Sequence, residues 1–182
     1  MDREIVKYLQ GDVSSILRRR GFVVEKISGG IEIDKRVSLR VGADRLVHLE
    51  SEDEERSIAL EDFMGEVDSI LHDLTSLKKI SRLVNKIAYY TSEGDSKSVD
   101  AFLSDLKEET LLYTQWGIVE PVKRAYESLK RGSRVSRSGD ALLVASKRGD
   151  VPKSIASDVV NLLRSVGYSE ERIPKLYRGE EE

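Results

Sequence analysis

The residues of this chain that are best suited to chemistry are cations spaced for phosphate binding. Between residues 123 and 153 there are nine lysines and arginines against three acidic residues, a local charge of +6. Glycines and serines separate these cations, so a phosphate backbone can approach the main-chain amides while lysine and arginine displace its counterions. The pattern predicts weak binding of DNA or RNA, with little sequence preference, through six residues: Lys130, Arg131, Arg134, Arg137, Lys147 and Arg148.

Aromatic side chains lie close to this basic segment in the sequence. Tyr113, Trp116 and Tyr126 either stack on nucleic-acid bases or fill the protein core, and we favour the core. The isoelectric point of the whole chain, about 5.6, argues against a dedicated nucleic-acid binder, because such domains usually have values above about 9.

Three carboxylates form a second candidate set. Asp34, Glu50 and Glu52 lie on, or directly after, neighbouring predicted strands. Three carboxylates repel the phosphate that they would have to cleave, so a phosphodiesterase built on them needs a divalent cation.

The segment order around these carboxylates also carries a resemblance. A helix, Gly21-Phe22, a meander and then Leu46-Val47-His48-Leu49-Glu50-Ser51-Glu52 resemble the core of the PD-(D/E)xK nuclease superfamily, which includes archaeal Holliday-junction resolvases. The resemblance implies that Asp34 and Glu50 correspond to the aspartate and glutamate that hold magnesium in that family. Glu52 occupies the position of the family's lysine. An anion therefore stands where the family has a cation that helps to stabilise the charge on the phosphate. The resemblance therefore implies a degenerate metal-dependent nuclease.

A second resemblance lies near the C-terminus. The sequence Leu163-Arg164-Ser165-Val166-Gly167-Tyr168-Ser169-Glu170-Glu171 resembles the helix-glycine-aromatic-helix corner of ubiquitin-associated-like three-helix modules. The resemblance implies that the glycine and the aromatic residue pack the corner and that its surface binds partners. The alternative is an ordinary packed corner in a helical protein.

Standard catalytic motifs are absent from the sequence, which has no Walker-type phosphate loop, dinucleotide-binding glycine fingerprint, paired-histidine zinc helix or nucleophile elbow. It has no cysteine, which excludes disulfides and thiolate metal sites, and only two histidines, His48 and His72. A metal site at Asp68 and His72 would depend on one helical turn, so we expect a solvated ion pair there. We expect His48 to be a partly buried strand residue. We predict no catalytic residue, no cofactor and no bound metal.

The elements that position these residues begin with a helix. Apolar residues recur at three- and four-residue steps, and Gly21 ends the pattern after three arginines. Short, branched segments then predict strands at residues 22–27, 31–34, 37–41 and 46–50. We expect a three- or four-stranded antiparallel meander with one face covered by a helix.

A long apolar stripe follows between residues 60 and 88. It predicts either one helix of about 35 residues or a hairpin broken near Thr75 and Ser76, either of which would cap the second helix. The stripe is either core, which its width favours, or the seam of a dimeric coiled coil. Further helices are predicted around residues 99–106, 121–131 and 155–166, with a strand at residues 141–146.

These patterns predict an α+β fold, with an N-terminal helix packed on a small antiparallel β-meander and then a mostly helical region with one late strand. We divide it into residues 1–52 and 53–182, or treat it as one continuous domain. Charged residues make up 35% of the chain and amide residues are scarce, a composition that suits a heat-adapted protein. No apolar run is long enough to span a bilayer and no secretory signal is present, so we expect a cytoplasmic protein with no membrane contact.

Three functional hypotheses follow. The leading one is a non-catalytic nucleic-acid-associated or regulatory module that uses the basic segment 123–153. The alternative is a protein–protein assembly factor that forms a homodimer, or binds another protein, through the helical stripe at residues 56–90. The third is the degenerate metal-dependent nuclease.

Overall fold

The computed structural model describes residues 2–108, 118, 122–124, 126, 127, 151–169, 171 and 173, and the structural statements below concern these residues. The chain divides into two compact units, residues 1–76 and 77–182. The division expected between residues 52 and 53 lies within the first unit. The α+β class is confirmed: an N-terminal helical segment precedes an antiparallel sheet, and helices follow it.

The N-terminal segment is helical from Arg3 to Arg19, with one wider turn inside it. It consists of α1 (Arg3–Tyr8), the π-helical turn η1 (Leu9–Val13) and α2 (Ser14–Arg19). Gly21 ends it with a φ of 87°, where the amide of Gly21 donates to the Arg18 carbonyl and that of Phe22 to the Leu17 carbonyl. This pair of bonds closes a Schellman motif, which needs a residue in the left-handed region, and the predicted helix end is confirmed.

The sheet is a meander of five strands in sequential order, every neighbouring pair antiparallel. The strands are β1 (Val24–Ile27), β2 (Gly30–Ile33), β3 (Val37–Val41), β4 (Leu46–Glu50) and β5 (Glu55–Ala59). The expected count of three or four strands is therefore wrong, because β5 was missed. Its sequence carries one buried residue, Ile58, and its connection to β4 contains neither glycine nor proline. Instead, the Ser51 hydroxyl accepts from the amides of Asp53 and Glu54 and closes that turn.

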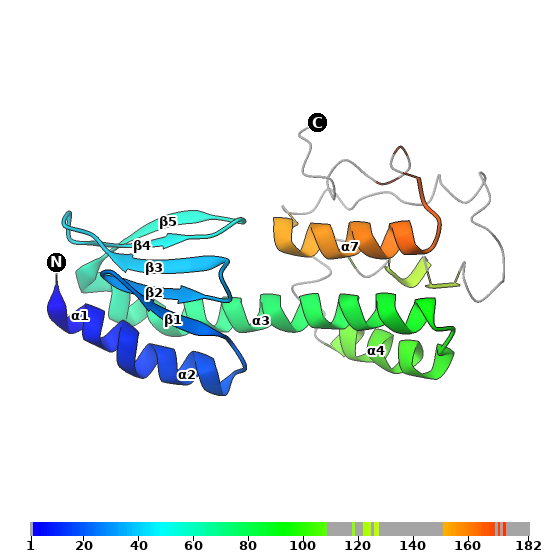
Figure 1. Cartoon of the computed structure of the whole chain (residues 1–182), viewed down its shortest axis with the longest axis horizontal. Coiled ribbons are helices and arrows are strands. Elements are labelled where there is room, and N and C mark those ends of the chain that lie inside the picture. The colour runs from blue at the N-terminus through cyan, green and yellow to red at the C-terminus, as the bar shows by residue number, and fades with distance from the viewer. Residues whose placement is uncertain are drawn as a thin grey trace. The chain divides into compact units, whose positions relative to one another are not determined.

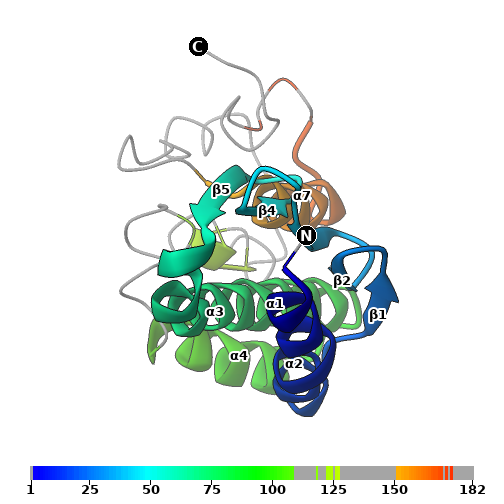
Figure 2. The same ribbon diagram turned by 90° about the vertical axis from the view of Figure 1, so that its left-hand side faces the viewer.

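One face of this sheet carries the core of the first unit. Alternating strand residues such as Ile31, Leu39 and Val47 are fully buried with Leu17 and Phe63 from the helices. In both views the strands lie on one side of α1, α2 and the first turns of α3 (Figures 1 and 2). The expected covering of one sheet face by a helix is confirmed.

The apolar stripe forms one continuous helix, α3 (Leu60–Ser92), and not a hairpin. Thr75, one of two caps that the hairpin alternative required, instead donates its hydroxyl to the Leu71 carbonyl four residues earlier, at 2.6 Å. The helix ends at a loop where Gly94 has a φ of 73°, and α4 (Ser96–Glu108) follows. The helix predicted around residues 99–106 is confirmed.

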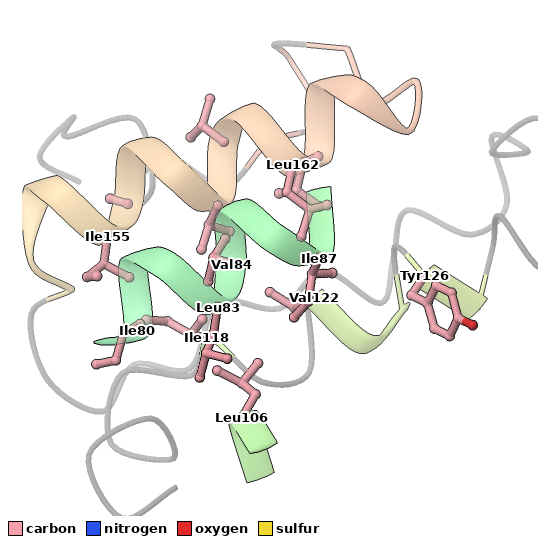
Figure 3. Close-up of a cluster of buried hydrophobic side chains, with 14 of the residues drawn as sticks. Ile80, Leu83, Val84, Ile87, Leu106, Ile118, Val122, Tyr126, Ile155 and Leu162 are labelled. Carbon is pink, nitrogen blue, oxygen red and sulfur yellow. The ribbon is translucent and has the colours of Figure 1, made fainter. Parts of the chain in front are cut away.

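The second unit is a helical cluster around a core of its own. The last described helix is α7 (Lys153–Ser165), which is followed by Val166 and then by Gly167, whose φ is 96°. Side chains of α3, α4 and α7 meet in the core with residues of the intervening segment (Figure 3): Ile80, Leu83, Val84, Ile87, Leu106, Ile118, Val122, Tyr126, Ile155 and Leu162. The predicted strand at residues 141–146, and most of the predicted helix 121–131, lie outside the described residues.

Two further expectations can be compared with the described part of the chain. Leu163 and Tyr168 are buried, whereas Gly167 is exposed and a β-carbon there would meet nothing within 4 Å. The aromatic residue therefore packs at this corner as expected, and the glycine supplies the left-handed turn rather than a packing contact. None of the helices among the described residues has the length and apolarity needed to cross a membrane.

Candidate functional site

The basic segment is the site predicted from the sequence, and the structure describes only its two ends. Lys130, Arg131, Arg134, Arg137, Lys147 and Arg148 all lie outside the described residues. At one end, Lys123 and Arg124 lie half-buried in a helical turn; at the other, Lys153 is exposed at the start of α7. Tyr126, beside the first end, is buried, and its hydroxyl donates to the Ser96 carbonyl at 3.0 Å. The expectation that Tyr126 belongs to the core is confirmed.

A second group of cations lies on α3 within the second unit. Between residues 74 and 92 there are four lysines and arginines and no acidic residue. Lys79, Arg82 and Lys86 are exposed, whereas Ile80 and Leu83 beside them are buried in the core. Residues three and four positions apart share one face of a helix, so these three cations form a single row, here called the α3 cationic face.

The helix dipole does not account for this row. Cations stabilise the negative end of a helix within its last turn. Lys86 lies six residues before Ser92, the last residue of α3, and Lys79 lies further away still.

An aromatic group continues the α3 cationic face toward the end of the helix. Tyr89, three residues after Lys86, is 59% exposed. Its ring lies edge-on to that of Tyr90, with centroids 5.1 Å apart, and Tyr90 stacks on Phe102 of α4 at 5.4 Å. Lys86 joins the two groups, because its ammonium nitrogen lies 5.2 Å from the centroid of the Phe102 ring. Cations and an exposed aromatic ring therefore lie together on one surface of the second unit.

Sequence reasoning missed this surface because it treated the stripe only as apolar. A signal was available: the cations at residues 78, 79, 82 and 86 are interrupted by no acidic residue, although one residue in three of the chain is charged. Their positions also fall in the gaps of the apolar stripe, which places them on the opposite side of the helix.

The carboxylates proposed for a metal site have other roles or stand apart. Asp34 lies in the turn between β2 and β3 with a φ of 50°, and its carboxylate accepts from the Val23 amide at 2.7 Å. Glu50 is exposed and pairs across the sheet with Glu55 on β5. Among the described residues, no three His, Cys, Asp or Glu side chains are grouped in a way that could hold a metal ion.

The sheet face that points away from the core is acidic. Strand register aligns Glu25 with Glu32, Glu32 with Ser38, Ser38 with Glu50, and Glu50 with Glu55, which forms a single row across all five strands. Like charges directly opposite one another destabilise a sheet. The row also repels phosphate, so this face of the first unit is unsuited to a nucleic-acid backbone.

A hydrogen-bonded series of an acid, a histidine and a serine lies on the same sheet face. His48 Nδ1 is 2.9 Å from the hydroxyl of Ser57, and His48 Nε2 is 3.0 Å from the carboxylate of Asp44. In the catalytic triad the serine faces Nε2 and the acid Nδ1, so the two partners of this imidazole are exchanged. His48 is half-buried on β4, as expected.

The acid of this series is held in place by its neighbours. Partial desolvation acts to raise the pKa of Asp44, but the hydrogen bonds from His48 and the Leu46 amide and the charge of His48 outweigh it, so the pKa lies below its usual value. A β-carbon at Gly42 would overlap the Asp44 carboxylate and lie 2.7 Å from His48 Nε2. Glycine at position 42 thus makes room for the contact, and we assign the series a structural role that joins the β3–β4 turn to β4 and β5.

His72, the other histidine, is exposed on α3 in the first unit. No metal group includes it within the part of the chain that the structure describes.

Comparison with known proteins finds no relative. No family model matches the chain, and no curated protein or solved structure matches it.

Proposed function

We propose that this protein is a non-catalytic nucleic-acid-associated module that binds the phosphate backbone of DNA or RNA through the second unit. The binding residues are those of the basic segment 123–153 together with the α3 cationic face. The observation that carries the proposal is the row of Lys79, Arg82 and Lys86, exposed on one helix face in a stretch with no acidic residue.

The distribution of charge between the two units supports this proposal. Residues 1–76 contain 11 lysines and arginines and 17 acidic residues, a net charge of −6. Residues 77–182 contain 19 lysines and arginines and 16 acidic residues, a net charge of +3. The low isoelectric point of the chain thus reflects the first unit, and it does not count against phosphate binding by the second.

The spacing of the cations suits a polyphosphate. Lys79 and Lys86 are separated by seven residues, or about 10 Å along the helix axis. Successive phosphates of one strand are about 3.4 Å apart along a stacked helix, so this row faces about three of them. Each lysine or arginine that neutralises a phosphate releases counterions, which favours binding at low salt.

The direct test is fluorescence anisotropy with labelled DNA and RNA, single-stranded and duplex. At about 50 mM salt we expect weak binding with little sequence preference. The logarithm of the binding constant for a duplex should fall with the logarithm of the salt concentration with a slope of about −4, which corresponds to the neutralisation of about four or five phosphates. Changing Arg131, Arg134 and Arg137 together to glutamate should abolish binding.

A charge-matched control separates local contact from net charge. Lys26, Arg36 and Arg40 are exposed cations of the first unit, and their triple change to glutamate alters the net charge by the same amount. We expect this control to lower affinity by no more than a few fold. Absence of binding by the wild-type protein, or equal loss in the control and the test variant, would contradict the proposal.

A further inference from the structure

We propose that Tyr89 is a stacking platform for an unpaired base, so that the ligand of the second unit is single-stranded nucleic acid. This inference rests on the proposed function, because it names the substrate class for the same surface. It adds a contact to bases where the proposed function requires contacts to phosphates only.

The exposure of the ring is the first argument. Tyr89 is one of three large apolar side chains that are exposed among the described residues, and the other two, Val23 and Met64, lie in the first unit. A single exposed apolar residue is common and needs no explanation. Tyr89 differs from the other two because an exposed cation, Lys86, lies three residues before it on the same helix face.

The contact of the Tyr89 ring with neighbouring rings is the second argument. Tyr90 and Phe102 are packed against the core of the second unit, and Tyr89 lies edge-on to Tyr90 at an interplanar angle of 82°. The supporting rings are thus held by the core while most of the Tyr89 side chain remains in solvent. An aromatic ring that is already positioned loses little conformational entropy when a base stacks on it.

The position of the ring relative to the cations is the third argument. Lys86 and Tyr89 are three residues apart on one helix face, about 4.5 Å along the axis. Proteins that bind single strands combine cations that follow the backbone with aromatic rings on which bases stack. Bases in a duplex are already stacked on one another, so this combination favours an unpaired strand.

The experiment compares three labelled ligands of equal length: oligodeoxythymidine, the same strand without bases, and a duplex. Each is titrated by anisotropy against wild type, Tyr89→Ala, Tyr89→Phe and Met64→Ala, which removes an exposed apolar side chain of α3 in the first unit. We expect wild type to bind the oligodeoxythymidine more tightly than the duplex. Tyr89→Ala should weaken that binding about tenfold and leave the strand without bases unaffected, whereas Tyr89→Phe and Met64→Ala should change little.

The outcomes separate the two proposals. If Tyr89→Ala leaves binding to oligodeoxythymidine unchanged while the triple change at Arg131, Arg134 and Arg137 abolishes it, the stacking inference is overturned and the proposed function remains. If Tyr89→Ala weakens binding equally with and without bases, the ring does not stack, and the inference is again overturned. If the wild-type protein binds none of the three ligands, both proposals fail.

Discussion

Truncation of Phe63 to alanine distinguishes a core role for the α3 stripe from a role in self-association. Among the described residues, Phe63 is the largest side chain that is fully buried, and it lies in the core of the first unit with residues of α1, α2 and the sheet. Replacing a buried phenylalanine by alanine costs about 3–5 kcal/mol, from lost apolar burial and from the cavity that remains. Since a domain is stable by only about 5–15 kcal/mol, this loss is a large fraction of the total.

The assay is urea denaturation followed by circular dichroism, with sedimentation to measure the oligomeric state. A loss of about 4 kcal/mol, with a denaturant slope of about 2 kcal/mol/M, lowers the midpoint of the first unit by about 2 M. Met64→Ala is the matched control, because Met64 is the next residue of the helix and is 52% exposed. Its change should stay within about 0.5 kcal/mol.

The assembly hypothesis predicts different results. If Phe63 and Val67 formed the seam of a homodimer, the wild-type midpoint would rise with protein concentration and Phe63→Ala would give a folded monomer of nearly unchanged stability. We expect a midpoint that is constant over about a 20-fold range of concentration, because both side chains are buried within one chain. A folded Phe63→Ala monomer with a wild-type midpoint would refute this reasoning.

Three further predictions concern local features and can be checked by thermal and chemical denaturation. Gly65→Ala should stabilise the protein by about 0.5–1 kcal/mol, because Gly65 is helical and exposed and a β-carbon there meets nothing within 4 Å; a loss of stability would contradict this. Gly30→Ala should destabilise it by about 1–3 kcal/mol, because a β-carbon there overlaps the Leu39 carbonyl, which is backbone and cannot rotate away. Asp95→Ala should lower the melting temperature at neutral pH, because the amide and hydroxyl of Ser98 donate to the Asp95 carboxylate and hold its pKa below the usual value. A lowered pKa stabilises the fold above the ordinary pKa of aspartate, so the difference should disappear as the pH falls through the lowered value, and a difference that is independent of pH would contradict the capping role.

The sequence-based predictions of the fold were most accurate where one residue type has one structural role, as glycine has at the ends of helices. Gly21 and Gly167 both adopt positive φ at helix ends, and the sequence predicted a helix end at or directly before each of them. Apolar periodicity placed the helices in the same way, because an apolar stripe must be buried for the helix to be stable. These signals are local, so no knowledge of the tertiary structure was needed to use them.

The sequence-based predictions failed where the structure depends on residues that have no strong preference for one secondary structure or one hydrogen-bonding role. The β4–β5 turn is closed by the Ser51 hydroxyl, and β5 is a partly exposed edge strand with one buried side chain, Ile58. Thr75 was interpreted as a possible cap, but a threonine hydroxyl can also bond to the preceding turn of a helix. Only tertiary packing decides between these uses.

The candidate site likewise has one part that the sequence predicts and one part that only the structure shows. Charge counting identified the basic segment, but the segment lies outside the described residues and its geometry stays a prediction. The α3 cationic face was missed because a cation in an amphipathic helix is usually interpreted as a solvated surface. The structure shows that the exposed Tyr89 lies beside Lys86 on the same helix face, and this combination of a cation and an aromatic ring is what indicates a binding surface.

Opposite charges on the two units have a consequence for affinity. Charges are screened beyond about 8 Å at physiological ionic strength, so the net charge of −3 repels a distant nucleic acid only weakly. Binding must then depend on local cations, and the acidic row disfavours phosphate on the sheet face of the first unit that carries it. A ligand held mainly by local phosphate contacts dissociates as salt rises, whereas a base stacked on Tyr89 is much less sensitive to salt. The salt slope of Tyr89→Ala should therefore equal that of wild type while its affinity at every salt concentration is lower.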